Sequence, residues 1–126
     1  PAQSFRAHAR RLPDSYWIAE PPAWQQANAL QVANAEARLG EVGAAVEVAD
    51  EPEFEATRVS VFSPDRPGLF YRIAAGLAAA GASIVDARIH TTRDGRALDN
   101  LLVLNARRQA YGDDRQRQRL ARAVER

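Results

Sequence analysis

Hydrophobic and polar positions change their period several times along the chain, and each change predicts a new element. Residues 23–39 are mostly strong helix formers and are followed by Gly40, which predicts a helix that stops there. Beyond it the period shortens to two, and valines that alternate with glutamate predict a strand over 44–49. The next run, 57–63, is rich in β-branched residues and predicts a second strand. Because only an acidic turn at 50–53 separates these two strands, they should pair antiparallel.

A helix and a hairpin are predicted to follow the second strand. Residues 69–80 place their apolar side chains on one stripe, which predicts an amphipathic helix. Residues 83–92 predict a third strand. The Asp94-Gly95 pair then predicts a two-residue hairpin turn, and 97–105 should return as the partner strand.

The register of this hairpin decides which side chains share a face of the sheet. With a two-residue turn, His90 faces Asp99, on the same side as Leu101 and Val103. We interpret His90 and Asp99 as a cross-strand pair rather than a catalytic pair, since no nucleophile is in reach. This side is more apolar than a solvent face needs to be, so we expect a second copy of the domain to cover it. The opposite side, which begins with Val85, should lie under the helices.

The order of elements predicts an α+β, ferredoxin-like sandwich that lacks its last strand. A final helix, capped by Asp113, completes it, and the helices should sit on one face of the antiparallel sheet. The 44–49 strand can take the edge position of the missing strand. We expect 1–40 to be a linker with a helical extension, whose apolar cluster at 16–18 must be buried, and 41–126 to be the domain itself.

Composition narrows the function classes. The chain has 126 residues, is 46% hydrophobic and 26% charged, and carries a net charge of +1, which favours neither a nucleic-acid nor a membrane partner. It has no cysteine, which excludes disulfides, thiol nucleophiles and thiolate metal sites. Without histidine or further ligands, the acidic stretch 50–53 is interpreted as a solvated turn, so we expect no metal or cofactor. No apolar run is as long as a membrane span, and a cytoplasmic protein is expected. Because methionine is absent, we expect the chain to be part of a longer protein.

The turn between the second strand and the following helix is the candidate site. Its residues are Asp65, Arg66, Pro67, Gly68 and Leu69. Amides at a helix start lack acceptors and attract carboxylates and phosphates. Pro67, which has no amide hydrogen, suits the first helical turn, and Gly68 allows a ligand close to the backbone. The pattern predicts a small-anion or amino-acid pocket, although a plain strand–helix connection with a Pro-Gly turn explains the same residues.

Several of these stretches together resemble an ACT domain. They are 63–69, 81–88 and the Asp94-Gly95 turn before a long strand. More closely, they resemble the first ACT domain of the bifunctional uridylyltransferase and uridylyl-removing enzymes, which modify the nitrogen-signalling protein PII. The stretch 12–17 is similar to the junction between the hydrolase domain and the ACT pair of those enzymes.

The resemblance implies a regulatory domain that binds glutamine and holds no catalytic residue. The parent protein would be the uridylyltransferase with uridylyl-removing activity, and PII would be a partner through that enzyme. A second ACT domain or a homodimer partner would complete the site. Carried over to this sequence, the ligand-binding residues are Asp65, Arg66, Pro67, Gly68 and Leu69 of the loop, with Ser83 and Ile84 at a domain interface.

Three alternatives stay open. A structural ACT domain would hold domains or protomers together without a ligand of its own. A phosphatase-like enzyme would use Arg66 or Arg72 with Asn100 as an anion and water site. An RNA-binding module would need aromatic stacking residues on the central strands, and 97–101 offers none.

Overall fold

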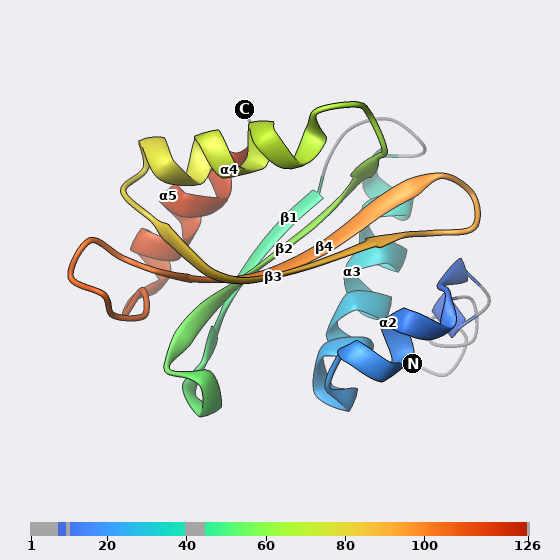
Figure 1. The fold of residues 1–126 in the computed structure, drawn as a ribbon, viewed down its shortest axis with the longest axis horizontal. Coiled ribbons are helices and arrows are strands. Elements are labelled where there is room, and N and C mark those ends of the chain that lie inside the picture. Colours follow the sequence, from blue (N-terminus) through green and yellow to red (C-terminus); the bar gives the residue numbers. More distant parts are fainter. Residues whose placement is uncertain (1–7, 10, 40–44, 126) are drawn as a thin grey trace.

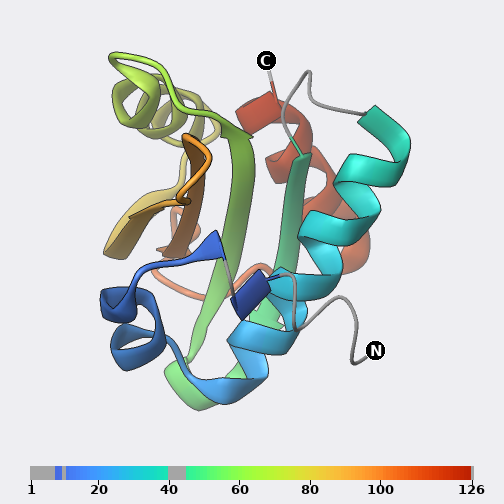
Figure 2. The same ribbon diagram turned by 90° about the vertical axis from the view of Figure 1, so that its right-hand side faces the viewer.

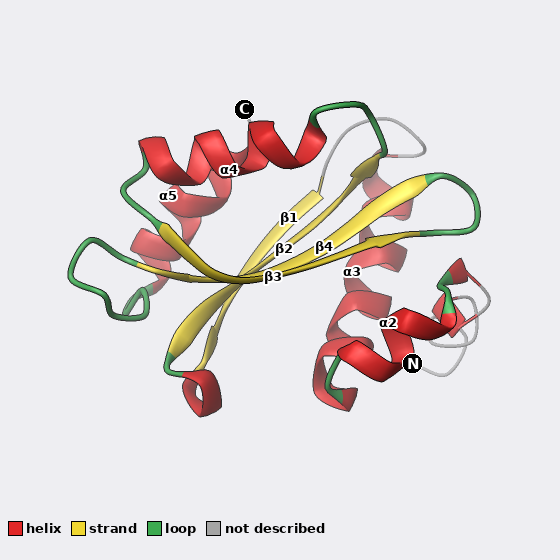
Figure 3. Cartoon of the chain, in the orientation of Figure 1, coloured by secondary structure: helices red, strands yellow, loops and turns green. Residues whose placement is uncertain are grey.

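The computed structural model describes residues 8–9, 11–39 and 45–125 of the chain. Figure 3 shows the sheet with helices on either side of it. The elements are α2 (Asp14–Ala19), α3 (Pro22–Leu39), β1 (Ala45–Glu51), the short 3-10 helix η1 (Pro52–Phe54), β2 (Ala56–Pro64), α4 (Leu69–Ala79), β3 (Ser83–Thr91), β4 (Arg96–Leu104) and α5 (Asp114–Glu125). The predicted helix stop at Gly40 and strand start at Ala44 lie outside the described residues.

The four strands form one antiparallel sheet in the order β1-β2-β4-β3. This confirms the ferredoxin-like α+β fold, with β1 at the edge that a last strand would occupy. The turn between β1 and β2 is shorter than the predicted acidic turn at 50–53. Asp50 and Glu51 still belong to β1, where they pair with Thr57 and Ala56 of β2. The reversal is confined to η1 and to Glu55, whose backbone is left-handed at φ 51°.

Helices α4 and α5 cover one face of the sheet and enclose the main apolar core (Figure 1). The buried members of this core are Val59, Val61, Ile73, Leu77, Ala82, Leu101, Val103, Tyr111 and Leu120. The two helices touch at Gly76, where an added Cβ would lie 2.8 Å from the carbonyl oxygen of Ala123. As predicted, Asp113 caps α5, since its carboxylate accepts a hydrogen bond from the Gln116 amide at 2.8 Å.

The hairpin turn is one residue longer than predicted. Thr91 pairs with Ala97, and the Thr92 amide donates to the Arg96 carbonyl at 2.7 Å, which leaves a three-residue loop. Gly95 occupies the left-handed region at φ 82°, as expected for a type I turn followed by a bulge. The Thr92 hydroxyl accepts a hydrogen bond from the Arg96 amide at 2.9 Å and so closes the turn.

This extra residue moves every predicted cross-strand partner, because side chains alternate between faces. His90 faces Leu98, and Asp99 faces Ile89 on the opposite side of the sheet, so the predicted His90–Asp99 pair is wrong. Leu101 and Val103 accordingly lie in the core under α4 and α5. A register shift between Ile84 and Asp86 leaves Val85 half exposed instead of under the helices.

The second face of the sheet is covered by α2 and α3 of the same chain, where we had expected a second copy (Figure 2). The prediction of helices on one face therefore holds for α4 and α5 only. Tyr16 is fully buried against Phe62 and Leu98, and Trp17 packs beside it, which confirms that the cluster is buried. The side chain of Ile18 lies outside the described residues. Helix α3 is described as far as Leu39.

Candidate functional site

The candidate loop connects β2 to α4 and contacts the hairpin turn between β3 and β4. The Asp65 amide donates a hydrogen bond to the Gly95 carbonyl at 3.3 Å. Helix α4 begins at Leu69, with Gly68 as its N-cap in the left-handed conformation at φ 76°. Pro67 therefore precedes the cap instead of lying in the first helical turn as predicted, because the left-handed residue separates it from the helix. The Leu69 amide already donates to the Arg66 carbonyl at 3.1 Å, so the first-turn amides that a ligand could use are those of Phe70 and Tyr71.

Four of the five predicted loop residues line one pocket of about 210 Å³. Pro67 is not among its lining residues. The pocket lies between the start of α4 and the neighbouring ends of β3 and β4. Its lining residues are Asp65, Arg66, Gly68, Leu69, Phe70, Tyr71, Ile89, Thr91, Ala97 and Asp99. The site thus combines a helix N-terminus, one arginine, two carboxyl groups and an apolar wall, a combination that suits a small zwitterion.

Asp99 is the charged lining residue that sequence reasoning missed. It lies on β4 between Val61 and Ile89, and only 1% of it is exposed. The pKa of its carboxyl group is raised to about 6, chiefly by burial and in smaller part by nearby Asp65, while the His90 amide and imidazole act in the opposite direction. Among the described residues, its Oδ1 atom has no hydrogen-bond partner. The sequence feature that could have identified Asp99 is its position as a carboxylate within an otherwise apolar central strand.

Ser83 and Ile84 lie at the far end of β3 from this pocket. Ser83 pairs with Leu104, and Ile84 packs on the α4–α5 core. The structure therefore does not bring them to the loop residues with which they were grouped.

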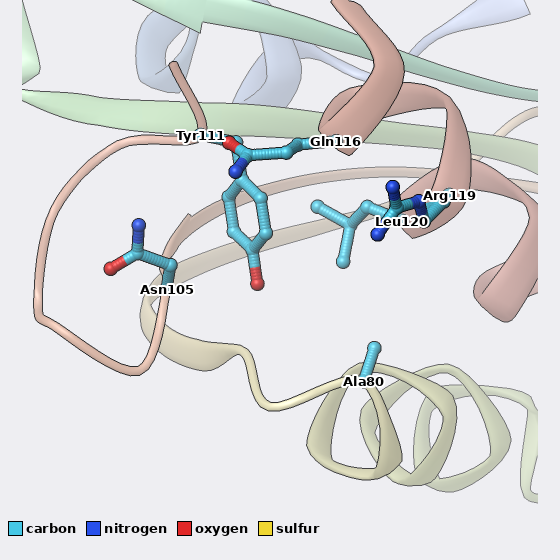
Figure 4. Close-up of a pocket in the computed structure, with 6 residues that line it drawn as sticks. All are labelled: Ala80, Asn105, Tyr111, Gln116, Arg119 and Leu120. Carbon is cyan, nitrogen blue, oxygen red and sulfur yellow. The ribbon is translucent and has the colours of Figure 1, made fainter. Parts of the chain in front are cut away.

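A second cavity of about 350 Å³ lies near the Ser83 end of the sheet, and Figure 4 shows the side chains around it. Its lining residues are Ala80, Asn105, Tyr111, Gln116, Arg119 and Leu120. The side-chain carbonyl oxygen of Asn105 accepts hydrogen bonds from two loop amides. The side-chain carbonyl oxygen of Gln116 accepts one from the Gly112 amide. These polar groups already hold the loop after β4 in place. The cavity therefore has fewer free hydrogen-bonding groups for a ligand than the loop pocket has.

A buried polar network fills the opposite side of the sheet, beneath α2 and α3. Asn28 donates to Asn100 at 3.1 Å, and Ser60 donates to Asn100 at 2.7 Å. Asn100 in turn donates to the carboxylate of Glu20, which is 3% exposed. The phosphatase-like alternative loses its basis here, because Asn100 is bonded within this network, on the opposite face from the Arg66 loop. An RNA-binding sheet face is also unsupported, since helices cover both faces.

None of the helices in the described ranges is long and apolar enough to cross a membrane. Nor does that part of the chain bring three or more acidic, histidine or cysteine side chains together as a metal site would require.

Comparison with known proteins identifies the relatives of the chain. Residues 57–110 match the ACT domain family. The bifunctional uridylyltransferase/uridylyl-removing enzyme of Erythrobacter litoralis is 45% identical over 98% of this chain and 13% of its own length. The enzyme of the same name from Zymomonas mobilis is 39% identical over 96% of this chain and 13% of its own, and that from Rhodospirillum rubrum 37% over 87% and 12%. The chain thus spans about an eighth of the length of these relatives.

Proposed function

This chain belongs to the ACT domain family, in the form found in bifunctional uridylyltransferase/uridylyl-removing enzymes, and from that premise we propose that it binds glutamine as a regulatory signal. The observation that carries the proposal is the loop pocket. It joins the N-terminus of α4, the Arg66 side chain and a buried carboxyl group around a space of about 210 Å³. A space of that size suits a free amino acid better than a larger ligand.

The loop supplies the groups that an α-carboxylate needs. The Phe70 and Tyr71 amides in the first turn of α4 would donate hydrogen bonds to it, and the helix dipole favours negative charge at this end. Arg66 would add a charge-assisted, bidentate hydrogen bond. The apolar side chains of Leu69 and Ile89 line the same pocket and would contact the aliphatic part of the ligand.

The remaining roles concern the whole enzyme. Its other domains would carry out uridylylation and uridylyl removal on PII in the cytoplasm, and this segment would supply neither a catalytic residue nor a cofactor. A second ACT domain or a second copy of the chain would pack beside it and complete the ligand site. In that arrangement Ser83 and Ile84 would contribute through the exposed edge strand β3, and not through the loop pocket itself.

The test is an amide NMR titration of this chain with glutamine, with glutamate and alanine as controls. We expect glutamine-selective shifts at Asp65, Gly68 and Leu69, because these residues line the pocket. Shifts that are absent at millimolar glutamine, or that are equal for all three amino acids, would contradict glutamine sensing by this segment.

A purely structural role is the second candidate, and the edge strand β3 favours it. Val85 and Ile89 are 49% and 53% exposed there, which is unusual for apolar side chains of a sheet and suits a packing surface. This role predicts a stable dimer whose melting temperature does not respond to any amino acid. The titration above and a melting series with glutamine therefore separate the two candidates.

A further inference from the structure

We propose that Asp99, and not the more obvious Asp65, is the carboxylate that binds the ammonium group of the ligand in the loop pocket. The pocket would then select ligands that carry a protonated amine and reject their keto or hydroxy analogues. This inference rests on the proposed function, because it assigns a specificity-determining residue to that same site.

The position of Asp99 is the first argument. The residue is 1% exposed, lies among the pocket-lining residues, and has an Oδ1 atom without a hydrogen-bond partner in the described part of the chain. The His90 amide stabilises this carboxylate, but Oδ1 still lacks a donor, and buried polar atoms in folded proteins are nearly always hydrogen-bonded. A ligand ammonium group in the pocket would supply the missing donor and the compensating charge.

The second argument is the contrast with Asp65. Asp65 also lines the pocket but is exposed to solvent, where an ion pair is worth little. Asp99 lies beside Ile89 and Ala97, in apolar surroundings that strengthen a charge pair. A ligand that lacks the amine would leave the buried carboxylate unpaired, so rejection follows from the same geometry.

The amine and the carboxylate of one ligand can be held at once. Arg66 and the start of α4 line the pocket from the loop and the helix, and Asp99 lines it from strand β4 of the sheet. Besides Asp65 and Arg66 of the loop, the ionisable groups near Asp99 are Tyr71 of α4, on the pocket wall, and His90 of β3. The loop thus contributes one charge of each sign, which leaves Asp99 as the buried anion.

The experiment compares glutamine binding to this chain and to two matched variants, Asp99→Asn and Asp65→Asn, by calorimetry at about pH 8, where Asp99 is ionised. We expect Asp99→Asn to weaken binding by about tenfold or more, and Asp65→Asn by less than about threefold. The wild-type chain should not bind the 2-oxo analogue of glutamine measurably.

The outcomes separate the two levels of the proposal. Wild-type protein that does not bind glutamine overturns the proposed function and this inference with it. Wild-type binding that Asp99→Asn leaves within about threefold, or that Asp65→Asn weakens more, overturns the inference alone and leaves the function standing.

A second readout does not depend on the folding of any variant. Wild-type affinity for glutamine should fall as the pH is lowered through about 6, as Asp99 gains its proton. An affinity that stays constant from about pH 8 to about pH 5 would overturn the assignment.

Discussion

Arg88 donates a hydrogen bond to the carboxylate of Glu20 at 3.2 Å, although 68 residues separate the two in the chain. Glu20 is the C-cap of α2, and its side chain is fully buried, whereas Arg88 belongs to the edge strand β3. The same carboxylate also accepts a hydrogen bond from Asn100 of the central strand β4. One buried side chain therefore fastens the N-terminal helices to two strands of the ACT domain.

Replacing Glu20 by glutamine should lower the free energy of unfolding by about 1–3 kcal/mol. The amide cannot accept from both Arg88 and Asn100 as the carboxylate does, so one buried donor loses its partner. Asp86→Asn is the matched control, because Asp86 also pairs with Arg88, at 3.1 Å, but its side chain is 44% exposed. We expect a change below about 0.5 kcal/mol for the control in urea unfolding. Equal effects of the two substitutions would contradict the anchoring role of Glu20.

Asp99→Asn should stabilise the chain at neutral pH. The folded-state pKa of Asp99, about 6, lies above its ordinary value, so the folded protein holds this proton more tightly than the unfolded chain. The contribution of Asp99 to stability is therefore greatest below about pH 4 and is lost as the pH rises through about 6. At about pH 7 the variant should be more stable by about 1–2 kcal/mol.

Denaturant unfolding over a pH series measures this difference directly. The advantage of Asp99→Asn should shrink toward zero below about pH 4, where the wild-type carboxyl group is also neutral. A variant that is less stable than wild type at neutral pH would show that the ionised carboxylate is already satisfied without a ligand.

Gly76→Ala should destabilise the packing of α4 on α5. The new Cβ would lie 2.8 Å from the Ala123 carbonyl oxygen, which is backbone and cannot rotate away. We expect a loss of about 1–3 kcal/mol, even after the better helix propensity of alanine is included. Gly112→Ala serves as the control, because nothing lies within 4 Å of its added Cβ. Thermal unfolding that ranks the two variants equally would rule out close approach as the reason for glycine at position 76.

Arg66→Ala should weaken glutamine binding by about threefold, because an exposed charge-assisted contact to the ligand carboxylate would be lost. Arg72→Ala is the matched control, since Arg72 is exposed on α4 and is not among the pocket-lining residues. Calorimetric titration of both variants measures the difference. If the two variants bind equally, net charge matters and the contact does not.

Local patterns predicted the elements well because each element carries its own period. Apolar residues spaced along one stripe identified α4, and β-branched residues identified β2. The hairpin was located correctly but given the wrong length. Asp-Gly suits a two-residue turn, whereas the choice of three residues depends on the Thr92 hydroxyl closing onto the Arg96 amide, a contact that no periodicity reveals.

The extra residue in the hairpin turn also explains why Asp99 was not predicted as part of the site. The wrong register put Asp99 beside His90, on the face opposite the loop, and so removed it from the candidate pocket. The loop residues were predicted correctly as a turn because a Pro-Gly pair indicates a turn from the local sequence alone. The position of α2 and α3 could not be predicted, because it depends on contacts such as Glu20 with Arg88 that join distant parts of the chain.

The place of β1 in the sheet has a consequence for how the domain folds. A last strand after α5 would have to find β2 across most of the domain, whereas β1 reaches it through η1, with Glu51 paired to Ala56 and Ala45 to Phe62. Closing so short a loop costs little chain entropy, and low contact order accelerates folding. The edge hairpin can therefore form early and give β4 a template on which to align.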